Sequence, residues 1–209
     1  MRIKQTTFIL IFLLATFFCF AQNEYLHFVE KQYDGILKEY YDSVYPLLYS
    51  DFSGKPYARY ISMPSFSEEY AFSVEKIKGK SYIISNTFSE SYWYAGYENR
   101  KDSVKIITIK TEISKELYIK IGELFEILSE VIIEPKRTGL DGTTYYFTTT
   151  NKKGEIKITE TWSPQQNSLL GRLIRICDYV FSIGVENNIS EELLLKGIEI
   201  FIKDLRINK

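Results

Sequence analysis

Two pairs of predicted β-strands, each joined by a tight turn, constrain the fold of this chain most. The first pair covers residues 70–88 and turns at Lys78-Gly79. The second pair covers residues 143–162 and has a four-residue turn at 151–154. Strands that tight turns connect must pair antiparallel, because a parallel crossover needs a dozen or more residues. The sequence therefore predicts an antiparallel sheet.

Four other segments have apolar residues at spacings of three and four, which is typical of amphipathic helices. We expect the first of these helices to end before Pro46 and the second to begin with Ser114 as its N-cap. A further β-branched strand is expected at residues 104–113, whereas residues 46–69, rich in Pro, Gly, Ser and Asp, are expected to be mostly loop with at most one short extended piece. The predicted helices cover residues 26–44, 117–132, 170–181 and 194–205. The fold class is therefore α+β, with a single antiparallel sheet of about five strands and helices packed on one face.

The second hairpin also predicts which side chains share a face of the sheet. With a four-residue turn, Tyr145 and Phe147 lie on the apolar face together with Ile158 and Trp162. Tyr146 then points outward, where a small polar residue would be the ordinary choice. We therefore expect Tyr146 to be exposed.

The N-terminus is typical of a cleaved export signal. Arg2 and Lys4 precede an uncharged apolar run over residues 8–20, and Cys19-Phe20-Ala21 resembles a signal peptidase site. The run is too short to span a bilayer, which needs about 20 residues. Residues 1–21 are thus expected to be a signal peptide and residues 22–209 a single α+β domain. In the alternative, Cys19 is the lipid-modified first residue of a lipoprotein, but the bulky Phe18 before it disfavours this.

Removing the leader leaves 188 residues, enough for one core, and a net charge of −3, because the leader takes away two basic residues and no acidic ones. The sequence has no large Lys/Arg cluster, so nucleic-acid binding is not expected. Cys177 becomes the one remaining thiol, which excludes an internal disulfide. Cys177 lies on the apolar stripe of its helix and is predicted to be a core residue.

Motifs for catalysis or cofactor binding are missing from the sequence. His27 is the single histidine, which excludes a multi-histidine zinc site and leaves little basis for a Ser-His or Cys-His nucleophile. Glycine-rich phosphate loops, G-x-S-x-G, C-x-x-C and calcium loops do not occur. We therefore expect no metal, no cofactor and no catalytic residue, and an enzyme is the less favoured class.

A polar constellation lies around the second hairpin. Arg137 and Asp141 lie in the glycine-containing segment before it, and Glu160 shares a strand face with apolar residues. A carboxylate in that position needs a cation such as Arg137 or a place beyond the sheet edge. Arg137, Asp141 and Glu160 could therefore form a small polar site, although a structural ion pair that stabilises the loop is the simpler interpretation.

The strongest candidate for a binding surface is an aromatic segment. Tyr92, Trp93, Tyr94 and Tyr97 crowd into it, and in a strand covered on one face some of them must point outward. Exposed Tyr and Trp give large contact areas at a small entropic cost. An outward Tyr146 would extend this patch, while packing at the sheet edge is the structural alternative.

These observations favour an exported, non-catalytic protein, periplasmic or extracellular, that binds a protein or a cell-envelope glycan. The alternative is an exported hydrolase in which Asp141 and Glu160 act as acid and base while Arg137 holds a negative group. That alternative requires the three side chains to converge in one cleft. A structural envelope component without a discrete site is the third hypothesis.

The leader makes the first testable prediction. Protein recovered from its native host should lack residues 1–21 and begin at Gln22, because signal peptidase cuts after the small Ala21. Intact-mass measurement and N-terminal sequencing check this. A product that retains Met1 and is recovered from cytosol would contradict export, and a lipid-modified Cys19 would instead establish the lipoprotein alternative.

Overall fold

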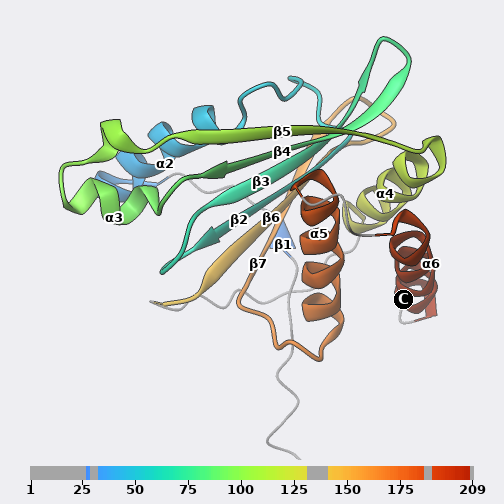
Figure 1. Cartoon of the computed structure of the whole chain (residues 1–209). Helices are drawn as coiled ribbons and strands as arrows, with labels where there is room; N and C mark the ends of the chain where they lie inside the picture. Colours follow the sequence, from blue (N-terminus) through green and yellow to red (C-terminus); the bar gives the residue numbers. More distant parts are fainter. Residues whose placement is uncertain (1–26, 29–32, 131–140, 186–189, 208–209) are drawn as a thin grey trace, which may run out of the picture.

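The computed structural model describes residues 27–28, 33–130, 141–185 and 190–207, which form one antiparallel sheet with helices on both faces (Figure 1). The predicted signal peptide, with Cys19, and Arg137 lie outside the described residues. The strand order across the sheet is β1-β7-β6-β2-β3-β4-β5. The strands are β1 (His27–Phe28), β2 (Ala58–Pro64), β3 (Tyr70–Ile77), β4 (Lys80–Phe88), β5 (Ile106–Ile113), β6 (Thr143–Thr150) and β7 (Ile156–Trp162). The helices are α2 (Gly35–Leu48), α3 (Tyr92–Tyr97), α4 (Lys115–Leu128), α5 (Leu169–Val185) and α6 (Glu191–Ile207), with a short 3₁₀ turn at Lys101–Ser103.

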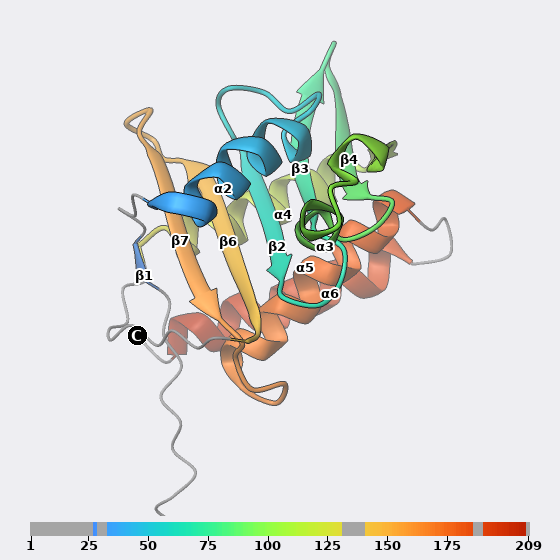
Figure 2. The same cartoon turned by 90° about the vertical axis from the view of Figure 1, so that its left-hand side faces the viewer.

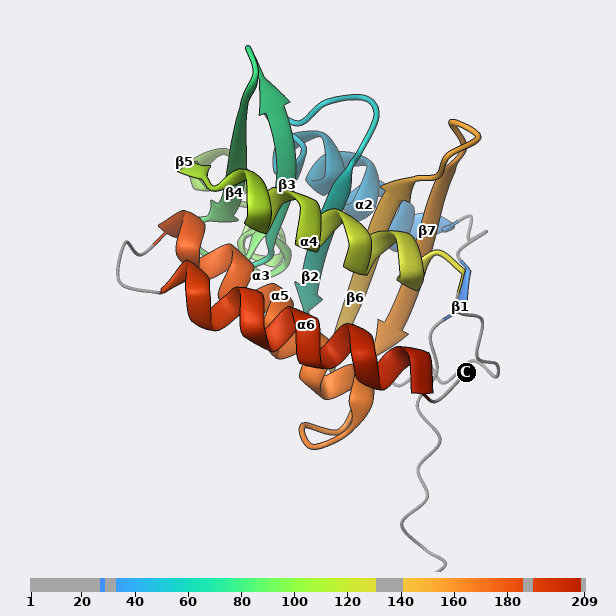
Figure 3. The same ribbon diagram turned by 90° about the vertical axis from the view of Figure 1, so that its right-hand side faces the viewer.

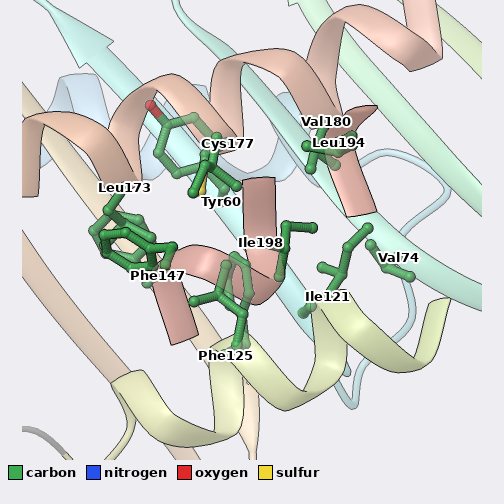
Figure 4. Close-up of a cluster of buried hydrophobic side chains, with 14 of the residues drawn as sticks. Tyr60, Val74, Ile121, Phe125, Phe147, Leu173, Cys177, Val180, Leu194 and Ile198 are labelled. Atoms are coloured by element: carbon green, nitrogen blue, oxygen red, sulfur yellow. The ribbon is translucent and has the colours of Figure 1, made fainter. Parts of the chain in front are cut away.

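The larger core lies between the sheet and helices α4, α5 and α6, which cover one face (Figure 3). Tyr60, Val74 and Phe147 from the sheet meet Phe125 of α4 and Ile198 of α6 in this core (Figure 4). The other labelled members are Ile121 from α4, Leu173, Cys177 and Val180 from α5, and Leu194 from α6. Cys177 is completely buried, which confirms its predicted place in the core.

One carboxylate is set into this helix–sheet interface. Asp178 of α5 accepts hydrogen bonds from the hydroxyls of Tyr60 and Tyr70, at 3.1 and 2.7 Å. Burial raises the pKa of Asp178. These two hydrogen bonds connect α5 to strands β2 and β3. They also satisfy the partly buried carboxylate, which would otherwise lack hydrogen-bond donors.

The second core lies on the opposite face, where α2 and α3 cover the sheet (Figure 2). Tyr40, Val44 and Leu48 of α2 pack on Ile61 and Tyr146 of the sheet. The C-terminus of α2 is held by the Asn86 amide, which donates to the carbonyl oxygens of Leu48 and Ser50 at 2.8 Å each. The molecule therefore has three layers.

The predicted α+β class and single antiparallel sheet are confirmed, but two features of the prediction are wrong. Helices cover both faces of the sheet rather than one, and the sheet has six strands of seven to nine residues plus the two-residue β1, rather than about five. Strand β2 comes from a segment expected to be mostly loop. Its residues 58–63 are all buried, so each face of the sheet needs a covering layer.

The helix expected at residues 26–44 is also different. His27–Phe28 instead pairs with β7, and α2 begins at Gly35 and continues through Pro46 to Leu48. The predicted N-cap of the next helix is confirmed, because the Ser114 hydroxyl accepts a hydrogen bond from the Leu117 amide at 3.1 Å. The turn at Lys78-Gly79 is present as well, with positive φ at both residues.

The register of the second hairpin differs from the prediction by one residue. Thr150 pairs with Ile156, so five residues rather than four form the loop, and Thr144 pairs with Trp162. A shift of one residue moves every side chain of a strand to the other face. Trp162 and Glu160 therefore lie on the α2 face, together with Tyr146, and not on the face of Phe147.

Two helical glycines offer a test of the packing of α5. A Cβ atom on Gly171 would lie 2.0 Å from the backbone oxygen of Gln165, whereas a Cβ on Gly197 of α6 would have no neighbour within 4 Å. We expect Gly171→Ala to lower the free energy of unfolding by about 1–3 kcal/mol, since backbone atoms must move. Gly197→Ala should raise it by about 0.5–1 kcal/mol, because alanine favours the helix.

Urea unfolding of both variants checks this pair. Equal effects of the two substitutions would show that the close approach of α5 to the loop before it is not as described.

Candidate ligand-binding site

The aromatic segment of the prediction forms a short helix, α3, and not a strand. The helical period of 3.6 residues turns Tyr92 and Ala95 toward the sheet, where both are buried. Tyr94 and Tyr97 point away from it and are 43% and 76% exposed. Trp93 lies between the buried and the exposed side of the helix and is half-buried. Some of the four rings therefore point outward, as expected, whereas Tyr92, which was included in the predicted binding surface, is buried.

A cleft of about 510 Å³, here called the aromatic cleft, lies where α2 and α3 meet the ends of three strands. Its floor includes Met63, Thr144 and Trp162, which are neighbours in one cross-strand row of β2, β6 and β7. The cleft is lined by Tyr33, Leu37, Tyr40, Tyr41, Met63, Pro64, Ser65, Phe66, Trp93, Tyr94, Asp141, Gly142, Thr144 and Trp162. A cavity of this size is in the range of small-ligand sites.

The aromatic rings of the α2 and α3 walls are fixed against one another. Tyr40 and Trp93 meet edge to face, with their centroids 5.1 Å apart and their planes at 90°. Tyr33 stacks on Tyr41 at 4.2 Å, and Tyr41 contacts Tyr40 at 5.1 Å. Such contacts favour one arrangement of the rings, so the walls are organised before any ligand binds.

A buried carboxylate holds the two helical walls together. Glu69, in the loop before β3, is fully buried and accepts a hydrogen bond from the Tyr40 hydroxyl at 2.5 Å. It also accepts from the backbone amides of Tyr92 and Trp93, at 3.0 and 3.3 Å, at the start of α3. Amide donors at a helix N-terminus favour a negative charge there. Glu69 thus sets the positions of Tyr40 and Trp93, the two rings that meet at 90°.

Tyr146 lies on the α2 face but beneath α2, and it is buried, contrary to the expectation that it is exposed. Its hydroxyl is 2.7 Å from that of Tyr33, a cleft residue, and either group can donate. Burial raises the pKa values of Tyr41, Tyr45 and Tyr146. These tyrosines are therefore neutral, and Tyr146 supports the cleft wall from behind.

The three members of the predicted polar site have different places. Asp141 is exposed and lines the cleft. Glu160 pairs with Tyr146 in the row beneath α2 and is buried outside the cleft lining. Arg137 lies outside the described residues. The structure therefore brings Asp141, but not Glu160, to the cavity.

Two smaller cavities continue the cleft at either end. One, of about 220 Å³, shares Tyr40 and Trp93 with it and reaches Tyr97 and Lys101. The other, of about 350 Å³, shares Phe66 and Asp141. Tyr97, predicted as a binding residue, thus lies at one end of a groove whose centre is the aromatic cleft.

Of the residues predicted for a site, Trp93, Tyr94 and Asp141 line the aromatic cleft and Tyr97 lines its smaller continuation, but most of the lining was not predicted. Tyr33, Tyr40 and Tyr41 lie in the segment predicted as the first helix, 26–44, and not in a predicted site, and Phe66 lies in a segment expected to be loop. Trp162 was assigned to the wrong face. One signal in the sequence could have indicated these residues, namely the high density of tyrosine in the α2 segment. Tyrosines at the border between the buried and the exposed face of a helix can contact both the core and a ligand.

Comparisons with known proteins add no relative, since no protein-family model, no curated protein and no solved structure matches this chain. Within the described part of the chain, none of the helices has the length and apolar character needed to cross a membrane. The same residues contain no group of three or more His, Cys, Asp or Glu side chains arranged to hold a metal ion. The cleft geometry is therefore the basis for any functional proposal.

Substituting Glu69 tests how the cleft walls are held. We expect Glu69→Gln to lower the free energy of unfolding by about 1–3 kcal/mol, because the amide group turns donors toward the Tyr40 hydroxyl or the α3 amides. Glu68→Gln changes the adjacent, exposed residue and should change stability by less than about 0.5 kcal/mol. Urea unfolding measures both, and equal effects would contradict the role of Glu69.

Proposed function

We propose that the protein is exported and binds a cell-envelope glycan, without catalysis, in the aromatic cleft. The observation that carries the proposal is the gathering of seven aromatic side chains around one cavity of ligand size. They are Tyr33, Tyr40, Tyr41, Phe66, Trp93, Tyr94 and Trp162. Aromatic side chains on a protein surface are normally scattered, so a concave cluster indicates a binding site.

The chemistry of the lining suits a sugar. A pyranose ring presents C–H groups on its faces, which pack on aromatic rings, and hydroxyl groups around its edge. The cleft supplies rings for the faces, and Ser65, Thr144, Asp141 and the tyrosine hydroxyls for the edge. Tyrosine and tryptophan combine an apolar body with a polar tip, which matches this mixed surface.

The shape favours a glycan over a protein partner. Stable protein–protein interfaces bury about 800 Å² on each side, which needs a broad surface. Here seven aromatic side chains line a concavity between α2, α3 and the sheet, and the exposed rings of the groove are Phe66, Tyr94 and Tyr97. A chain of sugar units fits the cleft and its two continuations.

Binding is also better supported than hydrolysis. Glycoside hydrolysis uses a pair of carboxyl groups about 5–10 Å apart that flank the scissile bond. Among the described residues that line the aromatic cleft, Asp141 is the single carboxylate, and Glu160 is buried beneath α2. Export is supported by the N-terminal leader and agrees with a domain whose one described cysteine, Cys177, is buried and free.

The fluorescence of the protein offers a direct binding assay, because both of its tryptophans, Trp93 and Trp162, line the cleft. The probes are the tetramers of glucose, N-acetylglucosamine and glucosamine. We expect at least one to shift the tryptophan emission, and Tyr94→Ala to weaken its binding about tenfold or more, a loss of about 1.4 kcal/mol.

The matched control is Tyr179→Ala, which removes a 54% exposed tyrosine from α5 on the opposite side of the sheet. It should leave the affinity unchanged. Both variants should unfold at nearly the wild-type temperature, since both rings are substantially exposed. If none of the tetramers shifts the emission, or Tyr94→Ala binds as the wild type does, the proposal is wrong.

A further inference from the structure

We infer that the glycan bound in the aromatic cleft carries protonated amino groups, as an oligomer of glucosamine does, and that Asp141 binds an ammonium group. This inference rests on the proposed glycan-binding function and adds the charge of the ligand to it. It follows from the charges along the groove, from the orientation of the rings and from the way in which Asp141 is held.

The described charged side chains at the cleft are acidic and not basic. Of the described residues that line the aromatic cleft and its 350 Å³ continuation, Asp141 is the single acidic residue, and none is basic. Asp141 forms no ion pair with another described residue. Lys101 lies at the far end of the groove, where Glu39 lines the same small cavity and balances its charge. An anionic glycan would therefore meet repulsion at the cleft, and a cationic one attraction.

The rings strengthen this preference. The face of an aromatic ring carries negative potential, and a cation within about 6 Å of the ring centroid is attracted to it. Tyr40 and Trp93 line the cleft with their planes at 90°, so a cation is attracted where it contacts the face of one of these rings, and not an edge, which carries positive potential. The protein uses the same interaction internally, since the Lys101 ammonium lies 5.7 Å from the centroid of Tyr92.

Asp141 is held at the cleft by its neighbour. The Gly142 carbonyl accepts hydrogen bonds from the Ser65 amide and hydroxyl, both at 2.8 Å. A Cβ atom on Gly142 would lie 2.8 Å from the ring of Trp162, and the φ angle of +153° also suits glycine. The absence of a side chain at Gly142 thus allows the turn to pack against Trp162. Asp141 is consequently placed beside an aromatic floor, the combination that recognises a substituted ammonium group.

The test compares two sugars that differ only in the amine. The full mature chain is titrated with the tetramers of glucosamine and N-acetylglucosamine at pH 6, and tryptophan emission is recorded. We expect the glucosamine tetramer to bind at least tenfold more tightly, because acetylation removes the positive charge while the ring remains. In Asp141→Asn this ratio should fall below about threefold, because binding of the glucosamine tetramer should weaken more than binding of the acetylated tetramer.

Glu192→Gln is the matched control, because it removes an exposed carboxylate of α6 on the other side of the sheet, and it should leave the ratio unchanged. Equal binding of the two tetramers, or a ratio that survives Asp141→Asn, would overturn the inference while glycan binding itself stands. Failure of both tetramers and of the glucose tetramer to bind would overturn both. Tetralysine binding as tightly as the glucosamine tetramer would also overturn it, because the cleft would then recognise a cation without the sugar.

Discussion

The burial of strand β2 on both faces of the sheet is the constraint on which the rest of the structure depends. Residues 58–63 alternate between the two faces of the sheet and all six are buried, so neither face can be left to solvent. Helices α4, α5 and α6 cover one face, and helices elsewhere in the chain must cover the other. The chain does this with α2, which is only 14 residues long, and with the six-residue α3. A helix of 14 residues spans about 21 Å, which is less than the width of the sheet.

The candidate site follows from this incomplete cover. The row Met63, Thr144 and Trp162 lies beside the N-terminal half of α2, whose Leu37, Tyr40 and Tyr41 line the same cavity, and forms the floor of the aromatic cleft. Glu69 then determines the shape of the walls, since one buried carboxylate binds the tip of Tyr40 and the first amides of α3. A cleft made in this way needs no dedicated loop. Its rigidity comes from the same contacts that close the second core, which explains why most of its residues resemble core residues in the sequence.

Local signals in the sequence were reliable where a local interaction decides the structure. The Lys78-Gly79 turn, the Ser114 cap and the burial of Cys177 each depend on a few neighbouring residues, and each was predicted correctly. Predictions that needed a tertiary partner were wrong or incomplete. The period of the aromatic segment could not be judged without Glu69, which is 23 residues before Tyr92 and stabilises the N-terminus of α3. Strand β2 was missed because its neighbours β3 and β6, rather than its own composition, make it the centre of the sheet.

The loop of the second hairpin shows how one residue separates the predicted site from the observed one. With four residues in the loop, Trp162 and Glu160 would lie on the core face and Tyr146 would face solvent. The Asn151 side chain accepts hydrogen bonds from the amides of Lys153 and Glu155, at 3.0 and 2.9 Å, and thereby stabilises a loop of five residues. The added residue moves Trp162 onto the floor of the cleft and puts Glu160 beneath α2, because the side chains of a strand alternate between faces. Glu160 is buried on the same face of the sheet as the cleft but outside its lining, and the exposed carboxylate of the lining, Asp141, belongs to the turn that packs against Trp162.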